Sequence, residues 1–75
     1  MSTPEFFANL TLDMWRASGA RTEERRDYLM TRNLETYFGP EPRWPNDVKQ
    51  LEVSARLLLR KNTRIDELSY GGRTK

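Results

Sequence analysis

The chain has 75 residues, with 13 basic and 11 acidic side chains and a formal net charge of +2 at neutral pH. It contains neither cysteine nor histidine, which excludes disulfides and metal sites built from thiolates or imidazoles. The commonest general base and the strongest side-chain nucleophile are therefore also missing, so we expect no enzymatic activity and no cofactor.

The length predicts one small domain, which we place at residues 1–70. Residues 71–75, Gly-Gly-Arg-Thr-Lys, are expected to form a flexible basic tail. The N-terminus lacks the basic start and the apolar run of a secretory signal. The longest aliphatic run, Leu-Leu-Leu at residues 57–59, is far too short to span a membrane. We expect a cytoplasmic protein with no membrane partner and no small-molecule substrate.

The first predicted helix covers residues 4–18. Thr3 is suited to cap it, Pro4 to its first position, and Gly19 to a left-handed stop after its end. Apolar residues lie on two sides of this helix at helical spacing. The main stripe consists of Phe6, Leu10, Met14 and Ala17, and the second side carries Ala8, Leu12 and Trp15.

The second predicted helix begins after the cap residue Thr22, ends near Phe38, and is stopped by Gly39 and Pro40. Its apolar side consists of Met30, Leu34, Tyr37 and Phe38. The opposite side carries a stripe of arginines around a tyrosine: Arg21, Arg25, Tyr28 and Arg32.

A proline-rich linker follows, and a third helix is predicted from the cap residue Asn46 to Lys61, with Asn62 as its terminator. Its main apolar stripe is Val48, Leu51, Ala55, Leu58 and Leu59. Thr63 begins a short final turn that includes Ile65 and Leu68. In the linker, Trp44 either plugs one end of a helical bundle or belongs to a presented proline-rich recognition segment, and we favour the plug.

These elements predict an all-α fold, a compact bundle of three helices with a short fourth helical turn at the C-terminal end. The core is expected to contain Phe6, Leu10, Met14, Leu34, Tyr37, Leu51, Ala55 and Leu58.

Val53 and Leu57 lie almost opposite the main stripe of the third helix, within a rim of charged residues. One small core cannot hide this pair and the second side of the first helix together, so surplus apolar surface points to a contact with a partner. The opposing interpretation is that Trp44, Ile65 or Leu68 folds back over one of these faces.

The leading hypothesis is a non-enzymatic protein-interaction module, such as an adaptor, an inhibitor or an assembly subunit, of a kind that phages and mobile elements encode. It docks apolar helix faces onto a partner protein or a second copy of itself. The expected contact residues are Leu12, Trp15, Lys49, Val53, Arg56, Leu57 and Arg60.

The alternative is a nucleic-acid-binding regulatory protein that uses the stripe on the second helix. Arginines beside an aromatic ring can hold phosphates and stack on bases, and they can also contact an acidic protein surface. Glu24 and Glu35 border the stripe, so an ordinary solvated helix face is a third interpretation. The residues concerned are Arg21, Arg25, Tyr28 and Arg32.

Overall fold

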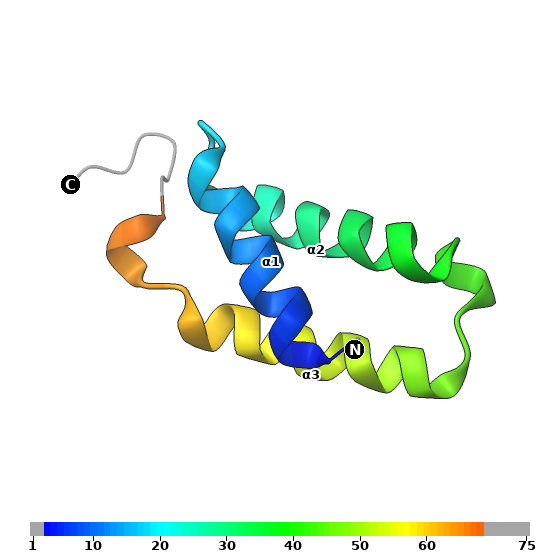
Figure 1. The fold of residues 1–75 in the computed structure, drawn as a ribbon. Helices are drawn as coiled ribbons and strands as arrows, with labels where there is room; N and C mark the ends of the chain where they lie inside the picture. Colours follow the sequence, from blue (N-terminus) through cyan, green and yellow to red (C-terminus); the bar gives the residue numbers. More distant parts are fainter. Residues whose placement is uncertain (1–2, 69–75) are drawn as a thin grey trace.

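The computed structural model describes residues 3–68, so the expected basic tail lies outside the described part. Within these residues it contains three α-helices, two short 3-10 turns and no strand (Figure 1). The elements in chain order are α1 (Pro4–Ala17), α2 (Glu23–Phe38), η1 (Glu41–Arg43), α3 (Asn46–Asn62) and η2 (Ile65–Glu67). The predicted all-α fold is confirmed, and η2 is the expected fourth turn.

The predicted starts of the first two helices are confirmed by hydrogen bonds. Thr3 Oγ1 accepts a bond of 3.0 Å from the Phe6 amide, and Thr22 Oγ1 accepts one of 3.1 Å from the Arg25 amide. Each threonine satisfies a backbone donor that has no partner inside the helix. Gly39 ends α2 with φ of 84°, in the region that favours glycine.

Three predicted boundaries are wrong in detail. Gly19 does not form a left-handed stop, because α1 already ends at Ala17 and Ser18 leaves it in an extended conformation. Asn46 is the first residue of α3 and not its cap. Pro45 occupies the capping position, and its side chain has no hydrogen-bond acceptor. Asn62 is the last residue of α3, not a terminator beyond its end.

α2 and α3 run antiparallel, joined by the segment containing η1, and α1 lies across both (Figure 1). α1 packs closely against both other helices, whereas α2 and α3 have fewer contacts with each other. The core therefore forms where α1 covers the pair. It consists of Phe7, Ala8, Leu12, Trp15, Met30, Leu34, Trp44, Ala55 and Leu59.

The predicted inner side of α1 is wrong. Phe7, Thr11 and Trp15, spaced four residues apart, are fully buried, while Phe6 and Met14 are 38% and 40% exposed. Leu10 is only half-buried. The small residues Ala8 and Thr11 in the middle of the inner side let α1 approach both neighbouring helices closely, because the side chains at a contact set the distance between helix axes.

The remaining predicted core residues divide into three groups. Leu34 and Ala55 are fully buried, as predicted. Leu51 and Leu58 are half-buried and pack at the edge of the core. Tyr37 is 52% exposed, because its ring covers Phe7 from outside, with 5.1 Å between the two ring centroids.

Trp44 is buried, and its indole Nε1 donates a hydrogen bond of 2.7 Å to the carbonyl oxygen of Gly39. The bond ties the connecting segment to the end of α2 and pairs the polar atom of an otherwise apolar side chain. Packing into the bundle is thus confirmed for this tryptophan. Within residues 3–68, no helix is both long and apolar enough to cross a bilayer.

Candidate interaction surfaces

The side of α3 turned away from the core exposes two aliphatic side chains one helical turn apart. Val53 is 58% exposed and Leu57 is 60% exposed, whereas Ala55 and Leu59 on the opposite side are fully buried. Residues four apart lie on the same helix face, so Val53 and Leu57 form one continuous apolar strip. Neither Trp44 nor η2 buries this strip, because both of its residues remain exposed.

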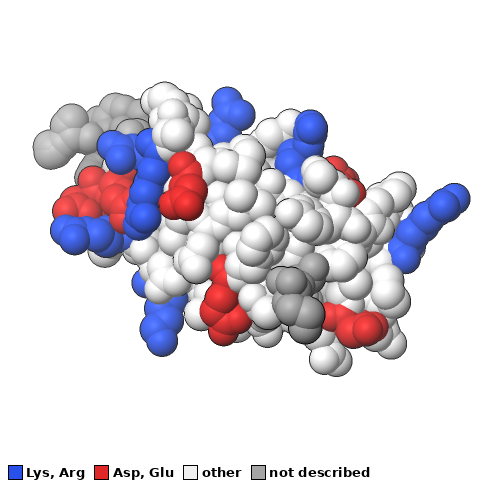
Figure 2. Space-filling view, viewed as in Figure 1, with Lys and Arg blue, Asp and Glu red and all other residues white. Residues whose placement is uncertain are grey.

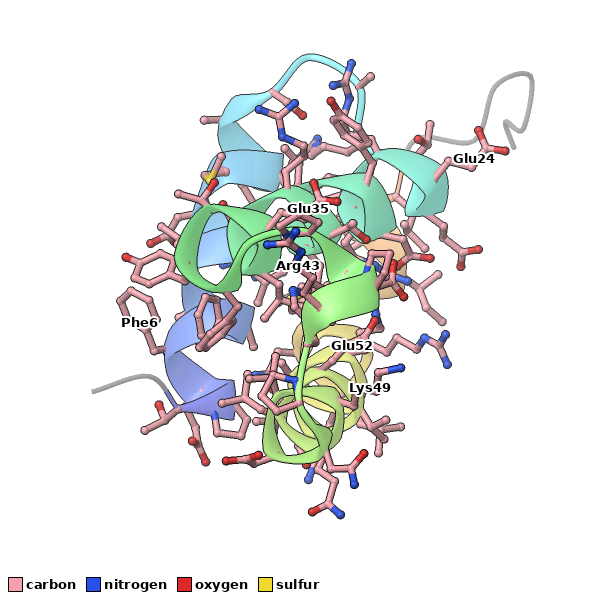
Figure 3. All side chains as sticks on the ribbon, turned by 90° about the vertical axis from the view of Figure 1, so that its right-hand side faces the viewer. Phe6, Glu24, Glu35, Arg43, Lys49 and Glu52 are labelled. Atoms are coloured by element: carbon pink, nitrogen blue, oxygen red, sulfur yellow. The ribbon has the colours of Figure 1, made fainter. Side chains whose placement is uncertain are left out.

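Basic side chains surround this strip. Lys49, Arg60 and Lys61 are exposed, and helical spacing places all three on the same side of α3 as Val53 and Leu57. Lys49 projects on the side of α3 away from α1 (Figure 3). A shallow hollow of about 430 Å³ borders the strip, lined by Asn46, Lys49, Gln50, Val53 and Ser54. We call Lys49, Gln50, Val53, Leu57, Arg60 and Lys61 the α3 outer face. It contains three cations and no acidic residue.

Arg56 does not belong to this rim, although the sequence predicts it there. Its Nε donates to Glu52 Oε2 at 3.0 Å, and its Nη2 donates to Thr31 Oγ1 at 2.8 Å. Its Nη1 also reaches the carbonyl oxygen of Asp27 at 3.4 Å. The guanidinium therefore joins α3 to α2. Helical spacing places Arg56 beside Val53 and Arg60, but these hydrogen bonds draw its charged end toward α2.

Leu12 and Trp15 are also wrong as exposed anchors, since they are 4% and 0% exposed. The indole Nε1 of Trp15 donates a hydrogen bond of 2.9 Å to the carbonyl oxygen of Thr22. The guanidinium of Arg26 lies over the Trp15 ring, with 5.9 Å from Cζ to the ring centroid. The indole fills the space between α1 and the start of α2, so a partner cannot contact it in this fold.

The structure brings together three of the four residues of the predicted arginine–tyrosine stripe. Tyr28 is 50% exposed, and the guanidinium carbons of Arg25 and Arg32 lie 6.0 and 5.9 Å from its ring centroid. Arg32 Nη1 also donates a hydrogen bond of 3.1 Å to the Tyr28 hydroxyl. We call Arg25, Tyr28 and Arg32 the Tyr28 cluster.

Arg21 stands apart from the Tyr28 cluster. It precedes α2, so the helical spacing that groups it with Arg25 does not apply. Its charge acts instead on Asp66, the middle residue of η2. The pKa of Asp66 lies below its ordinary value, chiefly because Arg64 donates a hydrogen bond to it and to a smaller degree because of the charge of Arg21. Figure 2 shows acidic and basic side chains crowded together at the end of the molecule that contains η2, on the left of the view.

A bidentate ion pair fastens η2 to α1. Arg16 Nε and Nη2 donate to the two carboxylate oxygens of Glu67 at 2.6 and 3.1 Å. The hydrogen bond from Arg16 is the main reason why the pKa of Glu67 is lowered. Glu67 Oε2 also accepts a bond of 3.1 Å from the Arg64 amide, which closes the 3-10 turn. This network holds Ile65 and Leu68 beside the start of α2 and the end of α3.

Sequence reasoning missed an aromatic group on the outside of α1 and α2. The rings of Phe6 and Tyr37 meet edge to face, with centroids 5.7 Å apart, and both contact the buried ring of Phe7. Figure 3 shows Phe6 on the outer side of α1. The two apolar sides of α1 indicated that one side would stay exposed. The sequence analysis placed the exposed side in the core and the buried side on the surface.

Arg26 was also missed, although it is the most deeply buried charged residue described. Only 5% of its surface is exposed, and it lines a hollow between the start of α2, the end of α3 and η2.

No metal-binding group of acidic residues occurs within residues 3–68. Comparison of the chain with protein-family models, curated proteins and solved structures gave no significant match.

Proposed function

We propose that this chain is a small non-enzymatic protein-interaction module that docks its α3 outer face onto a partner protein. The observation that carries the proposal is the exposure of Val53 and Leu57 inside a rim of Lys49, Arg60 and Lys61. An apolar centre that excludes water, surrounded by charges that remain solvated, is typical of protein interfaces. Covering the two aliphatic side chains provides affinity, and the rim determines which partners are accepted.

The charges of the rim indicate the chemistry of the partner. All three charged residues of the α3 outer face are basic. A second copy placed face to face would bring like charges together, which opposes symmetric self-association through this surface. We therefore propose a partner that presents an apolar ridge flanked by aspartate or glutamate, for example one acidic face of an amphipathic helix.

Two matched substitutions test this proposal. Leu57→Asp places a charge in the centre of the α3 outer face, and Tyr28→Asp makes a comparable change on α2 at a residue of similar exposure. Both side chains are at least half exposed, so we expect both variants to keep the helical circular dichroism of the wild type. The partner is sought by incorporating a photo-crosslinking residue at Val53 in cells of the source organism, followed by mass spectrometry.

The expected result is a crosslinked protein whose purified form binds the wild type and the Tyr28→Asp variant, but not the Leu57→Asp variant. Its affinity should fall as salt rises, because the rim acts through exposed charges. A partner that binds the Leu57→Asp variant with unchanged affinity would contradict the proposal. If sedimentation shows that the wild type is a dimer and that Leu57→Asp disrupts it, the partner is a second copy of the chain and not an acidic protein.

The Tyr28 cluster favours a second candidate function, binding of single-stranded nucleic acid. Two guanidinium groups beside an exposed ring can contact phosphates while a base stacks on the tyrosine. Glu24 borders the same surface hollow as Arg25 and Tyr28, which weakens the positive field there. Gel-shift titration of a labelled single-stranded oligonucleotide at two salt concentrations tests it. Binding should weaken steeply with salt and should be lost in Tyr28→Asp but not in Leu57→Asp.

A further inference from the structure

The outside of α1 carries a second exposed apolar surface, separate from the α3 outer face. Phe6, Leu10 and Met14 follow one another at intervals of four residues, and the ring of Tyr37 on α2 meets that of Phe6. Leu10 is half-buried, and the other three side chains are exposed although they are large and apolar. Phenylalanine, tyrosine and methionine are enriched where proteins contact each other. We call these four residues the Phe6 face.

The charges beside the Phe6 face are acidic. Glu5 and Asp13 are exposed on α1. The third charged residue of this helix, Arg16, donates two hydrogen bonds to the carboxylate of Glu67. The charges of Arg16 and Glu67 cancel, so α1 keeps the two negative charges of Glu5 and Asp13. The α3 outer face has the opposite sign, with three cations and no acidic residue.

The opposite charges of the two surfaces favour one way of joining two copies. A symmetric contact through either surface pairs that surface with itself and brings like charges together. A contact between the Phe6 face of one copy and the α3 outer face of another brings Glu5 and Asp13 toward a basic rim instead. The same contact removes the exposed apolar area of both surfaces from water.

We infer that copies of this chain associate head to tail, with the Phe6 face of one copy on the α3 outer face of the next. The inference rests on the proposed function, because it identifies a second copy as a partner with the apolar, acid-flanked surface described there. Figure 3 shows Phe6 and Lys49 on opposite sides of the molecule. One copy therefore cannot use both surfaces on the same neighbour, and association continues beyond a dimer.

Two variants each remove one side of this contact. Leu57→Asp places a carboxylate in the α3 outer face, and Met14→Lys places a cation in the Phe6 face, so each introduces repulsion toward the neighbouring copy. Both residues are exposed, so both variants should keep the helical circular dichroism of the wild type. Tyr28→Lys is the matched control, since it introduces a lysine at a residue of similar exposure outside both surfaces.

Sedimentation equilibrium of the full chain is measured from micromolar to millimolar concentration. We expect the mean mass of the wild type and of Tyr28→Lys to rise past that of a dimer, and to rise less at high salt. Leu57→Asp and Met14→Lys should each associate at least about tenfold more weakly on their own. An equimolar mixture of these two variants should recover association but stop at a dimer, because each variant supplies one intact surface.

A copy with one intact surface should also end a growing assembly. Leu57→Asp still presents its Phe6 face, so its addition to the wild type should lower the mean mass of the assemblies. A chain that carries both Leu57→Asp and Met14→Lys should have no such effect, because neither of its surfaces can bind a neighbour.

Three results would overturn the inference. One is a wild type that stays monomeric at millimolar concentration, and another is a wild type that stops at a dimer. The third is a mixture of Leu57→Asp and Met14→Lys that forms no complex. In each case the proposed function is judged separately, by whether a different protein crosslinked at Val53 loses its affinity for Leu57→Asp. The two failures are therefore distinguishable.

Discussion

The side-chain amide of Asn33 donates a hydrogen bond to the hydroxyl of Thr11 inside the interface between α1 and α2, with 2.9 Å between Nδ2 and Oγ1. Thr11 is fully buried and Asn33 is 7% exposed. The Thr11 hydroxyl also lies 3.8 Å from the sulfur of Met30, to which it donates. This polar pair holds α1 and α2 in one register, because sliding either helix would leave two buried polar groups without partners.

Replacing Thr11 by valine should destabilise the protein by about 1–3 kcal/mol, because the amide of Asn33 loses its acceptor in a buried position. The free energy of unfolding is measured by urea denaturation. Thr11→Val combined with Asn33→Leu should recover part of the loss, since an apolar pair leaves no polar group unsatisfied. A single variant as stable as the wild type would show that the pair does not contribute.

Trp15→Ala should cost about 3–5 kcal/mol of stability, because it opens a large cavity where α1 meets the start of α2 and frees the carbonyl of Thr22. Leu57→Ala should change stability by less than about 0.5 kcal/mol, as expected for an exposed side chain. Thermal unfolding of both variants provides the comparison. Equal effects would contradict the assignment of Trp15 to the core and Leu57 to the surface.

The attachment of η2 to α1 should weaken in acid. Glu67 has an ordinary pKa of 4.5, and in the folded protein the hydrogen bond from Arg16 lowers that pKa. A carboxylate with a lowered folded pKa stabilises the fold above its unfolded pKa, and this contribution is lost as the pH falls through the folded value. Titration of the Glu67 carboxyl carbon signal should therefore give a midpoint below 4.5.

Arg16→Gln is the control for this titration, and it should raise the pKa of Glu67 toward the ordinary value. The pH dependence of the Leu68 amide signal, which follows the titration of Glu67, should then move to the same higher midpoint. An unchanged Glu67 midpoint in the variant would show that the ion pair does not persist in solution.

Arg56→Met should lower the free energy of unfolding by about 1–2 kcal/mol, because it removes the hydrogen bonds to Thr31 and to the Asp27 carbonyl and leaves Glu52 without its cation. Arg43→Met provides a matched control at an exposed position. Urea denaturation of the two variants should separate them. If Arg56→Met matches the control in stability, the guanidinium does not link α2 to α3.

The candidate surfaces differ in how well the sequence predicts them. Val53 and Leu57 were expected to lie opposite the core, and Arg25, Tyr28 and Arg32 to share one side of α2, because each set lies within one regular helix. The role of Arg56 could not be predicted in the same way. Its partners Asp27 and Thr31 belong to another helix, and only the packing of α3 on α2 brings them within hydrogen-bond distance.

By itself, the sequence determined the number of helices, the start of α1 and both ends of α2, because caps, prolines and glycines act through local backbone geometry. Only the tertiary structure decided which side of α1 faces inward. Both the Phe6–Leu10–Met14 row and the Phe7–Thr11–Trp15 row have helical spacing, so periodicity cannot choose between them. The choice depends on packing α1 against two helices at once, where Ala8 and Thr11 permit close approach and Trp15 finds an acceptor at Thr22.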